Sequence, residues 1–277
     1  MTRRKRKQIT ILLHKIRELQ FTFSQIMLNA LILVHFCAHI LYSILLSIKS
    51  EITKDFFYGI DVGDAWLKLI VVGTKGFLHY MIYPSITNVV TFLFSTLCLR
   101  CSYRINHLTK KIAACPPESF GLSKQLDVLR SKTKINEVLY RIEDVFSFPT
   151  FFIILANALL SSSVIGWFLL QNWASSHVSL KIKSTFQLIS AFLSTTAIFW
   201  VAGGLAIEDR KFKEMFHRKI HLRMLYCGTT KEKDLGRNLS EEPSFALTGC
   251  NILPYRRSMI LAVFGTLFTY TVLIMNS

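Results

Sequence analysis

Hydrophobic residues are concentrated in five uncharged runs of 18 to 25 residues, separated by polar intervals that are rich in lysine and arginine. Eighteen uncharged residues are about the minimum for a helix that crosses the hydrocarbon core of a bilayer. The pattern therefore predicts an all-α polytopic membrane protein with one membrane domain, 1–277, and five transmembrane helices. The expected spans are residues 26–48, 77–99, 146–170, 184–207 and 258–275.

The apolar pattern continues as a helical stripe next to two of these spans. Apolar residues recur at helical spacing in 135–145, before the third span, and in 212–220, after the fourth. Such stripes need partners outside the membrane, so we expect helices that extend beyond the bilayer. The segments expected to pack there are 118–145, 208–226 and 244–256. Residues 245–253 are expected to form a short apolar helix or half-span, and Cys115-Pro116-Pro117 breaks the interval after the second span.

Basic residues are distributed unevenly between the intervals. The N-terminal 25 residues together with 100–145 and 208–257 hold 27 of the 33 lysines and arginines, whereas 49–76 and 171–183 hold 6. By the positive-inside rule, this excess predicts a cytosolic N-terminus and an extracellular C-terminus. The same placement accounts for the net charge of +16 without a nucleic-acid partner.

Charged side chains are missing from the spans themselves, since none of the five contains Asp, Glu, Lys or Arg. Proton pumps, ion-coupled carriers and voltage sensors usually keep such groups within the membrane. A carrier would also show two related halves with paired broken spans. The sequence therefore favours a pore or pocket lined by neutral polar and aromatic groups.

Histidines and cysteines offer few metal ligands. His35 and His39, like His217 and His221, have the i, i+4 spacing of a metal-binding pair, but the two pairs lie at different expected depths. The first pair fits hydrogen bonds between helices, and His39 also fits the wall of an outward-facing pocket. Cys98 with Cys101 falls short of the four ligands of a structural zinc site. We therefore expect no metal, no cofactor and no enzymatic activity.

The C-terminal stretch carries the most specific pattern. Thr269 and Tyr270 are followed by five mostly apolar residues and then by Asn276. By itself, this fits an interfacial aromatic residue and the polar end of a helix. The pattern nevertheless resembles the terminal signature of arthropod gustatory receptors, in the insect chemoreceptor superfamily, which has Thr-Tyr, five such residues and Gln-Phe. Residues that also fall where this family tends to have similar ones are Phe245, Gly249, Leu253 and Gly265.

The resemblance implies a ligand-gated, non-selective cation channel in the plasma membrane, which detects small-molecule tastants. Four subunits, identical or related, would assemble among membrane lipids, with the last span of each lining the pore and the cytosolic extensions forming an anchor. Asn276 would replace the glutamine of the family near the pore and shorten its reach by one methylene. The family has seven spans, and the five expected here correspond to its third through seventh. An incomplete gene model, a decaying paralogue and a naturally short receptor are the explanations for this difference.

A ligand pocket is expected to open outward among the outer halves of the first four spans. Aromatic walls with a few polar groups are typical of small-molecule sites. The candidates, chosen by depth and chemistry, are His39, Tyr42, His79, Tyr83, Trp167 and Phe192. The alternative functions are a non-receptor multi-pass membrane protein, such as a carrier or accessory subunit, a truncated non-functional paralogue, and a membrane-bound metal enzyme.

Overall fold

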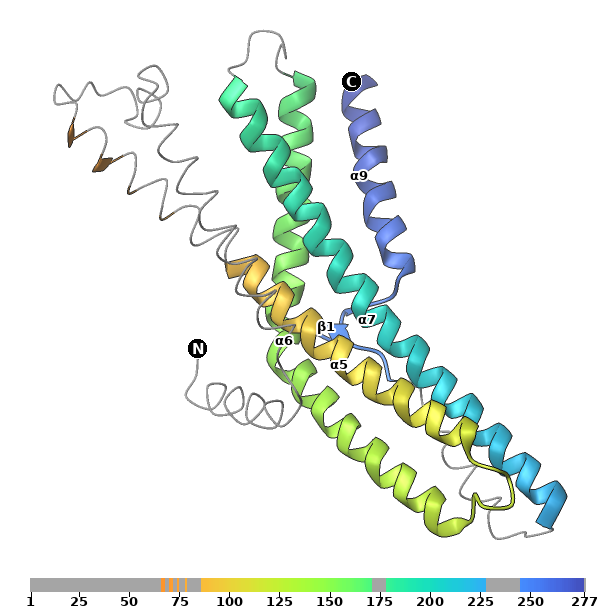
Figure 1. Cartoon of the computed structure of the whole chain (residues 1–277). Coiled ribbons are helices and arrows are strands. Elements are labelled where there is room, and N and C mark those ends of the chain that lie inside the picture. Colours follow the sequence, from red (N-terminus) through yellow and green to blue (C-terminus); the bar gives the residue numbers. More distant parts are fainter. Residues whose placement is uncertain are drawn as a thin grey trace.

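The computed structural model describes residues 86–170, 178–227 and 245–276, together with six positions between Trp66 and Leu78. In the three continuous segments the chain forms four helices and one two-stranded antiparallel hairpin (Figure 1). The elements are α5 (Ile86–Ala114), α6 (Leu122–Leu170), α7 (Val178–Cys227), β1 (Thr248–Gly249), β2 (Leu253–Pro254) and α9 (Ser258–Asn276).

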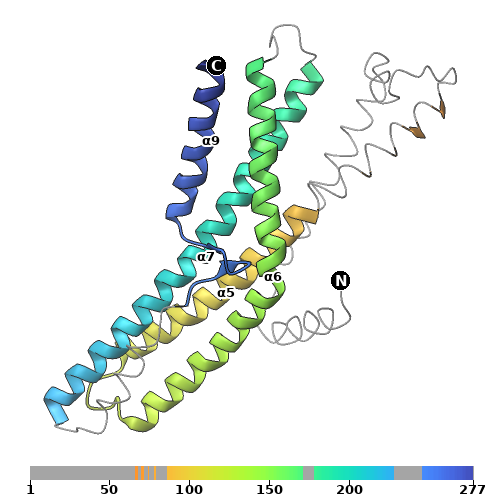
Figure 2. The same cartoon turned by 180° about the vertical axis from the view of Figure 1, so that it is seen from behind.

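The long helices divide the structure into a charged half and an apolar half. We define the charged half as residues 100–145 and 208–227, and the apolar half as 146–170, 178–207 and 258–276. In the charged half, α5, α6 and α7 lie side by side as a three-helix bundle, and in the apolar half α6 and α7 continue beside α9 (Figures 1 and 2). The hairpin lies between the two halves, next to the middle of α6.

Both α6 and α7 are too long to lie entirely within a membrane. Their 49 and 50 residues correspond to roughly 75 Å at the rise of an α-helix, about two and a half times the thickness of the hydrocarbon core. The prediction that helices continue beyond the third and fourth apolar runs is therefore confirmed. About half of each helix has to be stabilised by protein contacts rather than by lipid.

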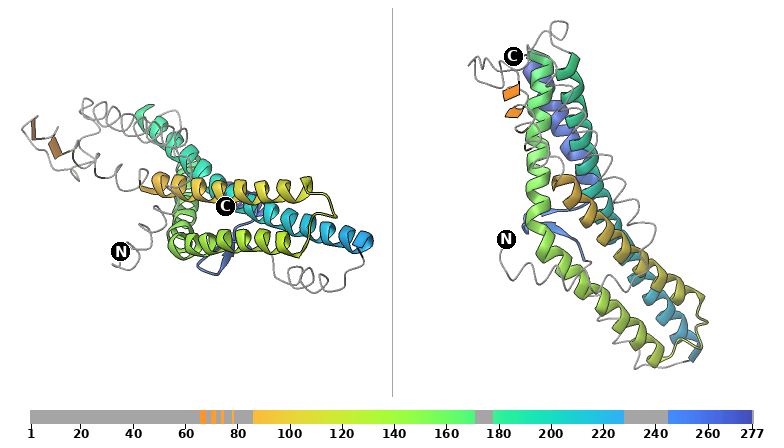
Figure 3. Two further views of the ribbon diagram at one scale, coloured as in Figure 1. Left: turned by 60° about the horizontal axis from the view of Figure 1, so that its bottom comes forward. Right: turned by 60° about the vertical axis from the view of Figure 1, so that its left-hand side comes forward.

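A bend in α6 separates its two halves, and it lies beside the hairpin (Figure 3, right). Pro149 is inside the helix at this level. Proline lacks an N–H, so the carbonyl of Val145 loses its helical partner and the ring crowds the preceding turn. Thr150 Oγ1 donates to the Phe146 carbonyl at 2.6 Å and satisfies one acceptor at the bend. The bend aligns the apolar half of α6 with α7 and α9.

The core of the protein lies mainly in the charged half and around the hairpin. Apolar side chains at every third or fourth position of the three helices point into the bundle, as the stripes in the sequence predict. The fully buried members include Ile105 and Ile112 of α5, Leu139 and Ile142 of α6, and Phe212, Phe216 and Ile220 of α7. These residues form one cluster with the aromatic side chains at the hairpin.

The apolar half has the opposite arrangement. Large hydrophobic side chains there are exposed, including Leu159 (64%), Leu193 (66%) and Leu261 (78%). Helices α5, α6 and α7 are each long and apolar enough to cross a membrane, and α9 contains a shorter apolar helix, Ser258–Leu273. Apolar side chains are buried in the charged half and exposed in the apolar half. This distribution is expected when only the apolar half is inserted into lipid.

Neutral polar side chains connect the helices within their apolar runs. Thr91 of α5 bonds with Ser194 of α7 at 2.9 Å, and Asn157 Nδ2 of α6 donates to Thr195 Oγ1 of α7 at 3.2 Å. All four residues are buried. In lipid, such bonds hold helices together because a polar group has few other partners.

One expected element is wrong. Residues 245–253 form no helix or half-span: residues 245–247 have no regular secondary structure, and β1 pairs with β2 so that Thr248 faces Pro254 and Gly249 faces Leu253. Cys250 and Asn251 between the strands have φ values of 53° and 58°. Left-handed residues at both positions make a tight hairpin turn, which a helix-period pattern does not reveal.

The other expected elements agree with the structure where it describes them. α5 ends at Ala114, just before the Cys115-Pro116-Pro117 break, and α9 covers the last expected span. The third and fourth spans lie within α6 and α7. The first span, 26–48, lies outside the described residues, as does the beginning of the second apart from Leu78.

Replacing Phe216 by alanine is expected to destabilise the protein by about 3 to 5 kcal/mol. The ring is fully buried and packs against the rings of Phe120 and Phe212. Leu225→Ala is the matched control on α7, because this side chain is 72% exposed, and it should change stability by less than about 0.5 kcal/mol. Thermal unfolding of the detergent-purified protein measures both. Equal melting temperatures would contradict a packed core in the charged half.

Candidate functional site

The chain that enters α9 passes between the two halves of the molecule, and we call residues 245–257 the junction segment. Side chains from all three long helices hold it in place. The segment contains three residues of the family-like pattern: Phe245, Gly249 and Leu253. It is the candidate functional site because it connects the core of the charged half to the last apolar helix.

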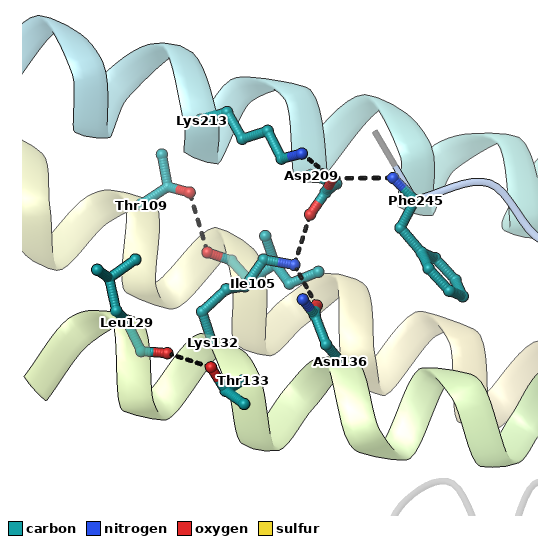
Figure 4. Close-up of polar contacts among 9 residues, drawn as sticks. All are labelled: Ile105, Thr109, Leu129, Lys132, Thr133, Asn136, Asp209, Lys213 and Phe245. Atoms are coloured by element: carbon teal, nitrogen blue, oxygen red, sulfur yellow. Dashed lines mark hydrogen bonds and ion pairs between the residues drawn. The ribbon is translucent and has the colours of Figure 1, made fainter. Parts of the chain in front are cut away.

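The first contact of the junction segment is with a buried carboxylate. Asp209 of α7 is 2% exposed, and one of its oxygens, Oδ1, lies 2.5 Å from Nζ of Lys132 on α6 (Figure 4). Its other oxygen, Oδ2, accepts the backbone N–H of Phe245 at 3.3 Å and lies 3.9 Å from Nζ of Lys213. A single carboxylate thereby joins α6, α7 and the start of the junction segment.

Lys132 is as deeply buried as its partner, with a side chain only 4% exposed. It also donates to Asn136 Oδ1 at 2.7 Å and lies 5.7 Å from the centre of the Phe212 ring. Removing two charges from water costs several kcal/mol for each ion, and the pair recovers this cost only with good geometry and further hydrogen bonds. The contacts of Lys132 and Asp209 meet both conditions.

A column of polar side chains on α6 holds the hairpin. Glu143, Ser147 and Thr150 lie on successive turns of one helix face. Glu143 Oε1 accepts the N–H and the hydroxyl of Thr248 at 3.1 and 2.8 Å, and Ser147 Oγ accepts the N–H of Cys250 at 2.7 Å. Backbone donors of a short hairpin have few ladder partners, so these side chains satisfy them. The bond to Cys250 also supports its left-handed backbone.

Tyr255 is the largest side chain buried in the junction segment, at 1% exposure. Its ring meets Phe94 of α5 and Phe199 of α7 edge-on, with centroids 6.2 and 5.8 Å away, and its hydroxyl bonds to Thr150 Oγ1 at 2.7 Å. Tyr255 therefore contacts all three long helices. Burial raises its pKa to about 12, so the hydroxyl stays protonated at physiological pH.

Gly249 is required by the position of Tyr255. A Cβ at residue 249 would lie 2.6 Å from the Tyr255 hydroxyl oxygen and 3.2 Å from Cβ of Phe151. Phe245 packs edge-on against Tyr140 at 5.3 Å, and Leu253 packs against the core. The three family-like residues of the junction segment thus have separate structural roles.

The signature residues of α9 lie apart from this cluster. Thr269 Oγ1 donates to the carbonyl of Gly265 one turn earlier, at 2.9 Å, and the side chain of Tyr270 is 53% exposed. A Cβ at Gly265 would meet nothing within 4 Å. Asn276 is the last residue of α9, and its side chain is not among those that the structure describes. The signature residues are therefore on a helix surface rather than in the core.

Of the expected ligand-pocket residues, the structure describes two. Trp167 packs against its neighbour Phe168 at 5.2 Å, and Phe192 of α7 contacts Phe264 of α9 at 4.7 Å. Phe192 therefore belongs to the contact between α7 and α9. The other four, His39, Tyr42, His79 and Tyr83, lie outside the described residues, and the pocket stays a prediction.

Within the described residues, no group of three or more His, Cys, Asp or Glu side chains is placed to hold a metal ion. Cys98 and Cys101 are both buried as free thiols in the core.

Comparisons with known protein families and curated proteins add no support to the resemblance to gustatory receptors. No protein-family model matches the chain, and no curated protein matches it significantly.

Lys132, Asp209 and Tyr255 were not among the residues selected from the sequence. A signal exists for the first two, because each charge interrupts an apolar stripe: Lys132 precedes Ile135 by three residues, and Asp209 precedes Phe212 by three. Opposite charges within two stripes that face each other indicate a buried ion pair. Tyr255 has no such signal, since its burial depends on the fold of the hairpin.

Asp209→Asn is expected to destabilise the protein by about 3 to 5 kcal/mol, because it leaves Lys132 buried without a counter-charge. Glu214→Gln is the matched control: it removes an acidic charge from the same helix, in a pair whose side chains are 69% and 68% exposed, and should cost less than about 1 kcal/mol. Adding Lys132→Met to Asp209→Asn should recover most of the loss. Thermal unfolding tests the set, and a double variant no more stable than Asp209→Asn would count against the ion pair.

Gly249→Ala is expected to destabilise the protein by about 1 to 3 kcal/mol through overpacking against Tyr255. Tyr255→Phe removes the hydroxyl that the new methyl group meets first, so it should cost less when Gly249 is already alanine than in the wild-type background. A double-mutant cycle on melting temperatures measures this coupling. Additive effects would show that the two residues do not constrain each other.

Proposed function

We propose that this protein is a gustatory-receptor-like chemosensory membrane protein, a subunit of a ligand-gated, non-selective cation channel that responds to small-molecule tastants. One observation carries the proposal: the helix that bears the Thr269-Tyr270 signature is uncharged, is held at its start by a buried junction, and exposes large side chains along its length. The exposed side chains include Leu261 (78%), Phe268 (72%) and Leu273 (64%).

The proposed topology has five spans in the plasma membrane, with a cytosolic N-terminus and an extracellular C-terminus. The excess of lysine and arginine in the charged half supports this orientation. The charged half then forms the cytosolic anchor, and the junction segment lies at the inner membrane boundary. From there α9 would cross to the outer surface.

In the proposed channel, four copies of α9 surround the ion pathway. A wall without charged side chains is consistent with weak discrimination among cations. The hydroxyl of Thr269 is already bonded to Gly265 within the helix, so the neutral group offered to the pore at this level would be Tyr270. The remaining exposed apolar residues of α9 would face neighbouring subunits and lipid.

Gating would be a shift between closed and open populations, with the ligand favouring the open one. Because the start of α9 is attached to the buried junction segment, a change of tilt would move the far end of the helix most. The contact between Phe192 and Phe264 joins α7 to α9 above the junction. It is the proposed route by which a ligand among the outer halves of the helices would act on α9.

A second candidate is an accessory subunit or another non-receptor membrane protein, such as a carrier, or a non-functional paralogue. Such a chain would reach the membrane and give no current by itself.

Recordings with substituted cysteines on α9 test the proposal. The chain is expressed in oocytes, alone and with a related seven-span receptor, and cation currents are recorded during application of a tastant panel. Cysteines are placed one at a time from residue 261 to 273. A pore-lining helix predicts that a charged thiol reagent blocks the current at positions of one face, repeating every three to four residues.

Tyr226→Cys is the control for these recordings, because this residue is 69% exposed but lies in the charged half. It should be insensitive to reagent applied from outside. Currents that no α9 cysteine modifies would remove the pore role. Surface-expressed protein without current, alone or with a partner, would favour the second candidate.

A further inference from the structure

Two arginines directly precede α9, and the second of them, Arg257, lies against an exposed tryptophan of α7. The guanidinium carbon of Arg257 is 4.2 Å from the centre of the Trp200 ring, and its Nε donates to the Trp200 carbonyl at 3.5 Å. Trp200 is 55% exposed. Arg256, which precedes Arg257 in the sequence, is exposed as well. This arrangement forms a surface patch with two cationic groups and one flat aromatic wall, which we call the arginine patch (Trp200, Arg256, Arg257).

Two glycines of α7 allow Arg257 to approach so closely. A Cβ at Gly203 would lie 2.8 Å from the backbone nitrogen of Arg257, and one at Gly204 would lie 3.0 Å from its Nη2. Any side chain at these positions would push Arg257 away from the helix. The glycines therefore allow the guanidinium to lie directly on the helix surface. Because Arg257 is already ordered there, a ligand that binds it loses less side-chain entropy on binding.

The arginine patch lies at the start of the apolar run of α9 and about two helical turns before α7 changes from apolar to charged. On α7, Ile189 and Leu193 before Trp200 are 52% and 66% exposed, and the first charge after it is Glu208. On α9, the uncharged run begins at Ser258, directly after the arginines. In a bilayer, this level is that of the lipid headgroups, where tryptophan and arginine are favoured.

The two positive charges have no acidic partner in the described part of the chain, where every ion pair that the structure shows involves other residues. A guanidinium presents paired N–H donors that match two oxygens of one phosphate. In Arg257, the Nε–H is directed to Trp200, and Nη2 lies over Gly204, where no side chain covers the helix. The patch therefore combines the charge and the geometry that a phosphate anion requires.

We propose that the arginine patch binds the phosphate of an anionic phospholipid headgroup in the membrane leaflet on the side of the charged half. Arg256 and Arg257 bind the phosphate oxygens, and Trp200 covers the glycerol region. In the orientation proposed above, this is the cytosolic leaflet, which carries the anionic lipids. The proposal requires that the chain spans a membrane, and it is independent of channel activity.

Lipid retention by the purified full chain tests this proposal. The protein in a neutral detergent is titrated with phosphatidylglycerol or phosphatidylcholine, and bound lipids are counted by native mass spectrometry. Arg256→Gln with Arg257→Gln should lower the affinity for phosphatidylglycerol by on the order of ten-fold, given the usual contribution of basic residues at anionic membranes. Weak binding of phosphatidylcholine should not change.

The matched control is Arg130→Gln with Arg210→Gln, which removes two exposed arginines from the charged half, 76% and 69% exposed. It should leave phosphatidylglycerol binding unchanged, and an equal loss here would overturn the site in favour of net charge. Equal affinity for the two lipids, or displacement of the lipid by excess inorganic phosphate, would also overturn it. If the double variant does not purify as folded protein, Arg256→Gln alone keeps the contact between Arg257 and Trp200. It should still weaken binding, and unchanged binding would contradict the proposal.

Discussion

The buried carboxylate of Asp209 is the group on which the arrangement of the charged half depends. It neutralises Lys132 of α6 and accepts the N–H of Phe245, so two helices and the incoming chain share one acceptor. Apolar stripes determine which faces of the helices meet, but an apolar contact tolerates sliding. A buried charge does not, because its partner has to stay within hydrogen-bonding distance. We infer that the ion pair fixes the register in which α6 and α7 pack, as single polar groups do in coiled coils.

The position of α9 follows from this register. Glu143, Ser147 and Thr150 receive the junction segment on α6, and these residues continue the helix that carries Lys132. Since much of the surface of α9 is exposed, the orientation of this helix depends more on how its start is held than on contacts along its length. The charged half thus determines the geometry of a helix that lies almost entirely in the apolar half. In the proposed channel subunit, this separation would provide a fixed base and a movable wall.

The sequence predicted the helices well and the junction poorly, for a physical reason. The apolar runs and the stripes around Leu139 and Phe216 are local patterns, so the long helices and their buried faces could be read from spacing. The hairpin at Cys250 depends on left-handed residues supported by Ser147, about one hundred positions earlier, and no local pattern records this. Phe245, Gly249 and Leu253 were selected by resemblance, and the structure supplies a contact for each. The signature at Thr269 and Tyr270 lies on the exposed surface of α9, and in the proposed channel its role would depend on neighbouring subunits.

The burial of Tyr255 has a consequence for biosynthesis. Its ring fills the space between Phe94, Phe199 and Thr150, and it follows all three of the helices that surround it in the chain. Until residue 255 has been synthesised, these helices surround an unfilled apolar space with unpaired polar groups of α6 at its edge. The native core therefore closes only after the junction segment has left the ribosome. A nascent chain that stops before residue 255 would present this open space to the quality-control machinery of the membrane, although its long helices would already be made.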